Sequence, residues 1–77
     1  MAICFILICA TPGKELEVYT AVSQVQGVTE LHSLFGEYDI IAKIQADDFD
    51  EIGNIIIHEI RYIEGVIDTK TLTGTRF

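Results

Sequence analysis

The turn Gly36-Glu37-Tyr38-Asp39 carries the side chains of this sequence that are best suited to hold a small ligand. A carboxylate at the end of a tight turn suits an ammonium group, and a neighbouring glycine lets a ligand approach the backbone closely. Tyr38 offers an aromatic wall and a hydroxyl group. Both residues also have a structural interpretation, in which Asp39 stabilises the turn and Tyr38 is a half-buried strand aromatic. These residues alone leave both interpretations open.

A second candidate feature is the pair Thr69 and Thr71 near the C-terminus. On a β-strand, residues two apart lie on the same face, so the two hydroxyl groups can converge on a polar ligand. Threonine is also a good strand former, and Thr73 continues the same alternation. The spacing therefore fits a binding face and an ordinary strand equally.

Catalysis near neutral pH would have to use His32 or His58, since only histidine titrates there without perturbation. Neither has a partner: His32 alternates with Glu30 on its predicted strand, and His58 lies on the polar side of a predicted helix. The sequence has no Ser-His-Asp order, metalloprotease motif, phosphate loop or dinucleotide fingerprint. We therefore expect a protein that is not an enzyme and has no cofactor or metal site.

The two cysteines, Cys4 and Cys9, lie on one predicted strand. Five residues of extended chain separate them by about 17 Å, whereas a disulfide needs Cα atoms within about 7 Å. Their odd spacing also directs them to opposite faces. We expect both to be reduced and buried in the core, with neither a disulfide nor a shared metal.

The first half of the chain predicts a strand followed by a helix. Residues 3–9 form a continuous apolar run, as expected for a strand covered on both faces. Thr11 is a plausible N-cap with Pro12 at the first helical position, and Gly27 ends the segment. One helical face carries the apolar residues Val18, Ala21, Val22 and Val25.

The second half predicts a hairpin, a helix and a final strand. Residues 28–35 and 40–46 are strand candidates joined by a short connection that contains Gly36. Asp48 and Glu51 form a variant of the capping box, which starts a helix. Residues 66–72 are rich in β-branched side chains and suit a strand. The helix has an apolar face made of Ile52, Ile56, Ile60 and Ile63.

The predicted order is β-α-β-β-α-β, in one domain over residues 1–77. This order is typical of the α+β ferredoxin-like fold, in which a four-stranded antiparallel sheet carries two helices on one face. The other sheet face of a monomer would meet water, although the first strand is apolar at every position. Exposing such a set is costly, so we expect a face-to-face homodimer to cover it.

The net charge and the hydropathy of the chain argue against some classes of binding partner. The formal net charge is -7 and only five residues are Lys or Arg, so there is no basic stripe to neutralise DNA phosphates. The apolar run at residues 2–10 is far shorter than the ~20 residues of a membrane-spanning helix, and it lacks the basic start of a signal peptide. We expect a cytoplasmic protein that binds neither DNA nor membranes directly.

Together these features resemble a known family. The Gly-x-Tyr-Asp turn at residues 36–39, Gly65-Val66 before the last strand, and Thr69-x-Thr71 on that strand occur in this order and spacing. They are similar to the C-terminal effector-binding domain, called RAM, of the Lrp/AsnC transcription factors. The resemblance covers nearly the whole chain. It implies a homodimer formed through the sheets, assembly of dimers into rings, and an amino-acid effector bound between subunits by Gly36, Tyr38, Asp39, Thr69 and Thr71.

Within that site, we expect Asp39 to bind the ammonium group of the effector, backbone N–H groups of the turn to bind its carboxylate, and the threonine hydroxyls to orient the rest. The 77 residues contain no helix-turn-helix segment. The resemblance therefore implies a stand-alone module that senses an amino acid and modulates transcription or metabolism through a partner. A full-length Lrp/AsnC-type regulator is one such partner.

Two alternatives share a related topology. The first is a small dimeric α+β-barrel enzyme that places His32 in a closed cavity. The second is an ACT-like allosteric module, which binds similar ligands but lacks the Gly-x-Tyr-Asp turn. A cavity lined by His32 would favour the enzyme, whereas a ligand between subunits would favour a sensor.

Overall fold

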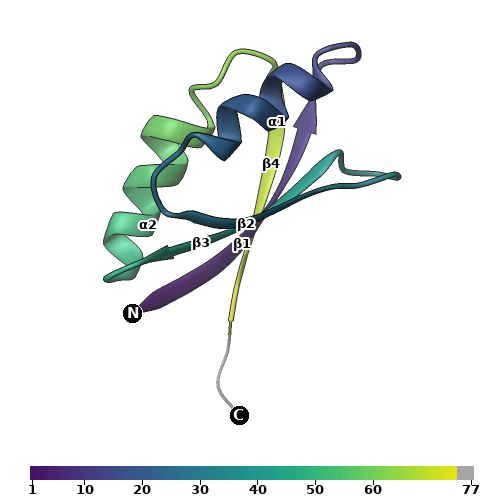
Figure 1. The fold of residues 1–77 in the computed structure, drawn as a ribbon. Coiled ribbons are helices and arrows are strands. Elements are labelled where there is room, and N and C mark those ends of the chain that lie inside the picture. The colour runs from purple at the N-terminus through teal and green to yellow at the C-terminus, as the bar shows by residue number, and fades with distance from the viewer. Residues whose placement is uncertain (75–77) are drawn as a thin grey trace.

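The computed structural model describes residues 1–74 and has the predicted order of elements. The elements are β1 (Ala2–Ala10), α1 (Glu15–Ser23), β2 (Val28–Ser33), β3 (Ile40–Ala46), α2 (Phe49–Ile55), a π-helical turn η1 (Ile56–Ile60) and β4 (Val66–Thr73). The strands form one sheet in the order β2-β3-β1-β4, and every neighbouring pair is antiparallel (Figure 1). The ferredoxin-like prediction is confirmed.

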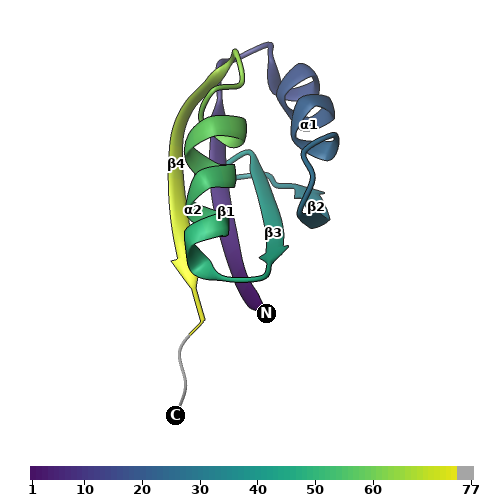
Figure 2. The same ribbon diagram turned by 90° about the vertical axis from the view of Figure 1, so that its left-hand side faces the viewer.

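Both helices lie on the same side of the sheet (Figure 2). The α1 helix contacts β2, whereas α2 contacts β1 and β3. The core lies between the two layers, because alternate residues of β1 and β3 point toward the helices and are buried. Its largest fully buried side chains are Ile6, Ile8, Ile40, Ile44, Ile60, Val18, Val22 and Cys4.

The first helix starts later than predicted. Thr11 does not cap it: the Lys14 backbone N–H donates to the Thr11 carbonyl at 2.8 Å, which closes a turn over Pro12 and Gly13. Gly13 has φ +89°, the conformation that a Pro-Gly type II turn requires at its third residue. The helix therefore begins at Glu15, and no side chain caps its N-terminus.

The capping prediction for the second helix is confirmed. The Glu51 backbone N–H donates to Asp48 Oδ1 at 2.8 Å, and Glu51 Oε2 accepts a hydrogen bond from the Asp47 backbone N–H at 3.3 Å. The predicted apolar face is buried at Ile52, Ile56 and Ile60. A π-helical turn follows, however, which the sequence pattern does not indicate: the Arg61 N–H donates to the Ile56 carbonyl at 2.8 Å.

The sheet face opposite the helices is open. Along β1, the residues that alternate with the core remain accessible, with Ile3 36% and Phe5 39% exposed, and Leu72 of β4 is 43% exposed. Cys9 lies on this open face, so the prediction that both cysteines are buried in the core holds only for Cys4. Both are free thiols on opposite faces, as expected. No helix within residues 1–74 has the length and hydropathy needed to cross a membrane.

Two glycines give a matched test of the packing around the helices. A Cβ atom at Gly65, which has φ +100°, would lie 2.9 Å from Cγ2 of the buried Val18. Gly53, in α2, has open space around the same position. We expect Gly65→Ala to lower the free energy of unfolding by about 1–3 kcal/mol, and Gly53→Ala to raise it by up to about 1 kcal/mol.

Urea unfolding at one fixed protein concentration measures both changes. Equal effects of the two substitutions would contradict the predicted close contact between Gly65 and the first helix.

Candidate functional site

Asp39 joins the hairpin to the first strand. Its backbone N–H donates to the Ile8 carbonyl at 2.9 Å, and its carboxylate Oδ2 accepts a hydrogen bond from the Ala10 N–H at 2.8 Å. Its own carbonyl accepts from the Leu34 N–H at 2.8 Å. The second carboxylate oxygen, Oδ1, receives no hydrogen bond from residues 1–74. Asp39 thus stabilises the turn with one oxygen, while its other oxygen has no hydrogen-bond donor within residues 1–74.

A cavity of about 220 Å³ lies beside Asp39, between the first helix and the start of β3. The Tyr19 hydroxyl, at its wall, donates to the Leu31 carbonyl at 3.5 Å. The cavity combines apolar walls with the carboxylates of Glu15 and Asp39. Its lining consists of Glu15, Leu16, Tyr19, Ser33, Asp39 and Ile40.

Tyr38 lies close to Cys9 and Asp68 rather than in that cavity. Partial burial raises the pKa of the Tyr38 hydroxyl, and the negative charges of Glu37 and Asp68 raise it further. The hydroxyl therefore stays protonated at neutral pH and can donate a hydrogen bond. Gly36 has φ +153°, and a Cβ atom there would meet nothing within 4 Å, so the backbone at this turn is open to an approaching molecule.

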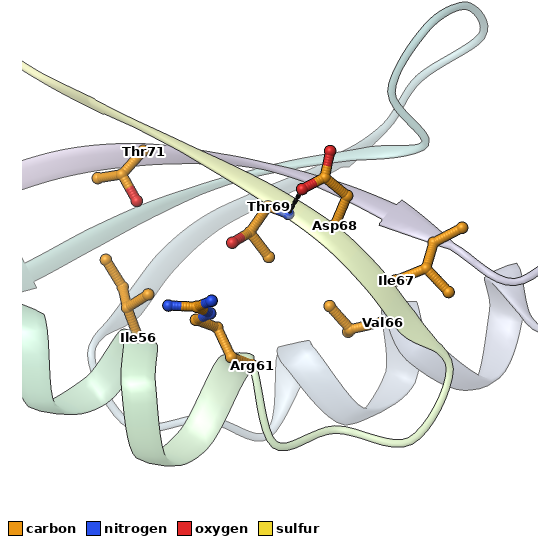
Figure 3. Close-up of a pocket in the computed structure, with 7 residues that line it drawn as sticks. All are labelled: Ile56, Arg61, Val66, Ile67, Asp68, Thr69 and Thr71. Atoms are coloured by element: carbon orange, nitrogen blue, oxygen red, sulfur yellow. Dashed lines mark hydrogen bonds between the residues drawn. The ribbon is translucent and has the colours of Figure 1, made fainter.

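Thr69 and Thr71 line a different cavity, of about 360 Å³, between η1 and β4 (Figure 3). The two threonines share a strand face, as predicted from their spacing. They pair with Ile8 and Ile6 of β1, both core residues, so this face is turned toward the helical layer. The lining consists of Ile56, Arg61, Val66, Ile67, Asp68, Thr69 and Thr71.

One chain does not bring the two halves of the predicted site into a single cavity. Asp39 lies on the β3 side of β1, where it bonds to Ala10, whereas β4 with its threonines lies on the other side of β1. The cavity lined by Asp39 and the cavity lined by Thr69 and Thr71 share no residue. A ligand within either cavity of one chain therefore contacts only one half of the predicted site.

Arg61 was missing from the sequence-based candidates, although it lines the larger cavity. The available signal was a basic residue directly after the isoleucine face in a chain with twelve acidic residues. That signal does not reveal its direction, because an ordinary α-helix would place Arg61 differently from the π turn that the structure contains.

The histidines lie outside these cavities. His32 is exposed on the open sheet face, with Nε2 3.6 Å from Glu30 Oε1, and Lys43 Nζ is 3.4 Å from the other oxygen of Glu30. His58 is exposed on η1. The cavities described above, and a third beside Gln26 and Glu59, are lined by other residues. Residues 1–74 contain no cluster of three potential metal ligands.

The sequence of this chain is similar to known ligand-binding domains and transcriptional regulators. The family model of the Lrp/AsnC ligand binding domain matches residues 3–75. An uncharacterised HTH-type transcriptional regulator of Pyrococcus horikoshii is 39% identical over 73 residues, which cover 91% of this chain and 49% of that protein. This chain thus spans about half the length of the curated regulators that it matches.

Two further similarities differ in extent. A segment of the homocitrate synthase of Sulfurisphaera tokodaii is 40% identical over 62 residues, which cover 74% of this chain but only 13% of that enzyme. A solved structure from Thermus thermophilus superposes with a TM-score of 0.93 at 28% identity, and covers 100% of this chain and 96% of that chain. The match of the family model along almost the whole length shows that this chain belongs to the family of Lrp/AsnC ligand-binding domains.

Proposed function

We propose that this protein is a regulatory module without catalytic activity that senses an amino acid at subunit interfaces and transmits the signal to a partner. The observation that carries the proposal is the larger cavity, in which the hydroxyl-bearing Thr69 and Thr71 face a space of about 360 Å³ in a chain of a ligand-binding family. That volume lies at the lower end of the range for small-molecule sites, which suits a ligand of amino-acid size.

Asp39 supplies the complementary charge. A carboxylate with one oxygen held by Ala10 and the other available is already oriented, so it can bind an ammonium group at little entropic cost. Tyr38 and the open backbone at Gly36 lie in the same turn as Asp39 but outside the cavity that Asp39 lines, so in this proposal they contact the ligand from the turn itself. In the proposed assembly, this half on one chain faces Thr69 and Thr71 on another chain, so ligand and assembly depend on each other.

The open sheet face favours a homodimer as the unit of that assembly. Its centre is apolar, formed by side chains of β1, β3 and β4, and charged residues of both signs border it. Two such faces can bury their apolar centres against each other while the bordering charges pair. Dimers then join into a higher oligomer. The apolar centre consists of Ile3, Phe5, Leu7, Cys9, Ile41 and Leu72.

In this proposal, the module transmits the signal of ligand binding to another protein. A full-length Lrp/AsnC-type regulator is a suitable partner, because it contains a related domain with which mixed assembly is possible. The similarity to a segment of a homocitrate synthase supports control of a metabolic enzyme as a second route. We place the module in the cytoplasm, where its two free thiols stay reduced.

Calorimetric titration of the wild-type protein with each of the twenty amino acids tests the proposal. At least one amino acid is expected to bind with a dissociation constant well below millimolar. If none binds more tightly than about 1 mM, amino-acid sensing is excluded, since a charge-assisted contact at each end of the ligand should give more than the ~4 kcal/mol that 1 mM represents.

A further inference from the structure

Arg61 is a cation that has no ionic partner among residues 1–74 of a strongly acidic chain. Lys14 lies 3.5 Å from Glu17 and Lys43 lies 3.4 Å from Glu30, whereas Arg61 and Lys70 form no salt bridge within residues 1–74. Of these two unpaired cations, only Arg61 lines the cavity. The chain offers twelve acidic residues to pair with. A guanidinium group presents five donors in a planar fork, so an unpaired one at a cavity leaves a strong anion-binding group unused.

The π turn explains why Arg61 lies at this cavity. Residues five apart in an α-helix are separated by about 140° around the axis, because each residue advances by about 100°. In η1, the bond from the Arg61 N–H to the Ile56 carbonyl closes a wider turn, which returns Arg61 toward the side of the helix that Ile56 occupies. Ile56 faces the sheet and is buried, and both residues line the cavity against β4.

Figure 3 shows the arrangement that results. The guanidinium group of Arg61 extends over the space between Ile56 and the β4 strand, on the same side as Thr69 and Thr71. Asp68 points to the other side of the strand, and its Oδ1 accepts a hydrogen bond from the Thr69 backbone N–H at 3.0 Å. Asp68 borders the cavity but forms no salt bridge with Arg61, so the cavity presents a guanidinium group without an ion pair and two hydroxyl groups beside Ile56 and Val66.

From this geometry we infer that the cavity between η1 and β4 is a carboxylate site, in which Arg61 binds the carboxylate of the effector and Thr69 and Thr71 orient it. The fork of a guanidinium matches the two oxygens of a carboxylate, and hydroxyl groups donate to the same oxygens. Ile56 and Val66 provide apolar contact for the rest of the ligand. This assignment replaces the backbone N–H groups of the hairpin turn as the expected carboxylate contact.

The inference extends the proposed function and rests on it for the class of ligand. In an amino acid bound between two chains, the carboxylate would contact Arg61 of one chain and the ammonium group would contact Asp39 of the other. A 2-oxo acid, which lacks the ammonium group, would still bind to Arg61 through its carboxylate. The two halves can therefore be tested separately.

The test combines changes in the protein and in the ligand. Wild type, Arg61→Gln, Arg61→Lys and the control Lys14→Gln are titrated by calorimetry with the twenty amino acids, their carboxamides and the corresponding 2-oxo acids. Lys14→Gln removes one positive charge at an exposed site outside the cavity. Wild type and Lys14→Gln are expected to prefer the carboxylate over the carboxamide by about ten- to a hundredfold.

Arg61→Gln is expected to lose that preference, and Arg61→Lys to retain part of it, because lysine keeps the charge without the fork. Amino-acid binding with an unchanged preference in Arg61→Gln overturns the carboxylate site and leaves the proposed function intact. Binding of 2-oxo acids alone, dependent on Arg61, supports the carboxylate site and excludes amino-acid sensing. If neither class binds wild type, both proposals fail.

Discussion

Leu7→Asp is expected to convert the assembled protein into folded monomers, whereas Ile6→Asp is expected to prevent folding. The two residues are neighbours on β1 and point to opposite faces of the sheet. Leu7 belongs to the apolar centre of the open face, and Ile6 is completely buried under the helices. An aspartate at position 7 can be solvated once the chains separate, so its main cost falls on the dimer.

An aspartate at position 6 remains buried without a partner, at a cost of about 5 kcal/mol or more, which is comparable to the whole stability of a small domain. Sedimentation equilibrium measures the mass of each variant, and circular dichroism measures its folding. An assembled Leu7→Asp variant, or a wild type that is monomeric at micromolar concentration, would contradict the sheet-to-sheet dimer.

Asp39→Asn is expected to weaken amino-acid binding by about ten- to a hundredfold while leaving the stability close to that of wild type. The amide oxygen of asparagine can still accept the hydrogen bond from the Ala10 N–H, so the turn remains supported. The substitution removes only the negative charge that the ammonium group needs. A charge-assisted hydrogen bond contributes about 1.5–3 kcal/mol, which corresponds to the stated loss of affinity.

Asp39→Ala is the matched variant, because it removes the charge and also leaves the Ala10 N–H without its partner. We expect the same loss of affinity together with about 1–3 kcal/mol lower stability. Calorimetry and urea unfolding separate the two effects. If Asp39→Asn binds the effector as tightly as wild type does, Asp39 serves only the turn and the ligand site lies elsewhere.

The fold could be predicted because its signals are local or strictly periodic. The Asp48–Glu51 capping interaction spans three residues, and the isoleucine spacing after it matches a helical period. The first helix was misplaced because a Pro-Gly turn and a helical N-cap share the same residue types, and only the positive φ of Gly13 separates them.

The candidate site was harder to predict than the fold. Thr69 and Thr71 share a face because strand alternation requires it, but the strand order decides that β1 separates them from Asp39. Arg61 was missed because its direction depends on a π turn, whereas the spacing of the isoleucines matches an ordinary α-helix. Contacts between elements, and between chains, thus lie beyond what spacing along one sequence can indicate.

The central claim is that amino-acid binding and assembly occur in the same particle, and native mass spectrometry tests it in one measurement. The purified protein is sprayed alone and with each of the twenty amino acids at millimolar concentration. We predict an oligomer with an even number of chains that retains the mass of at least one amino acid. A monomer, or an oligomer to which no amino acid adds mass, would contradict the claim.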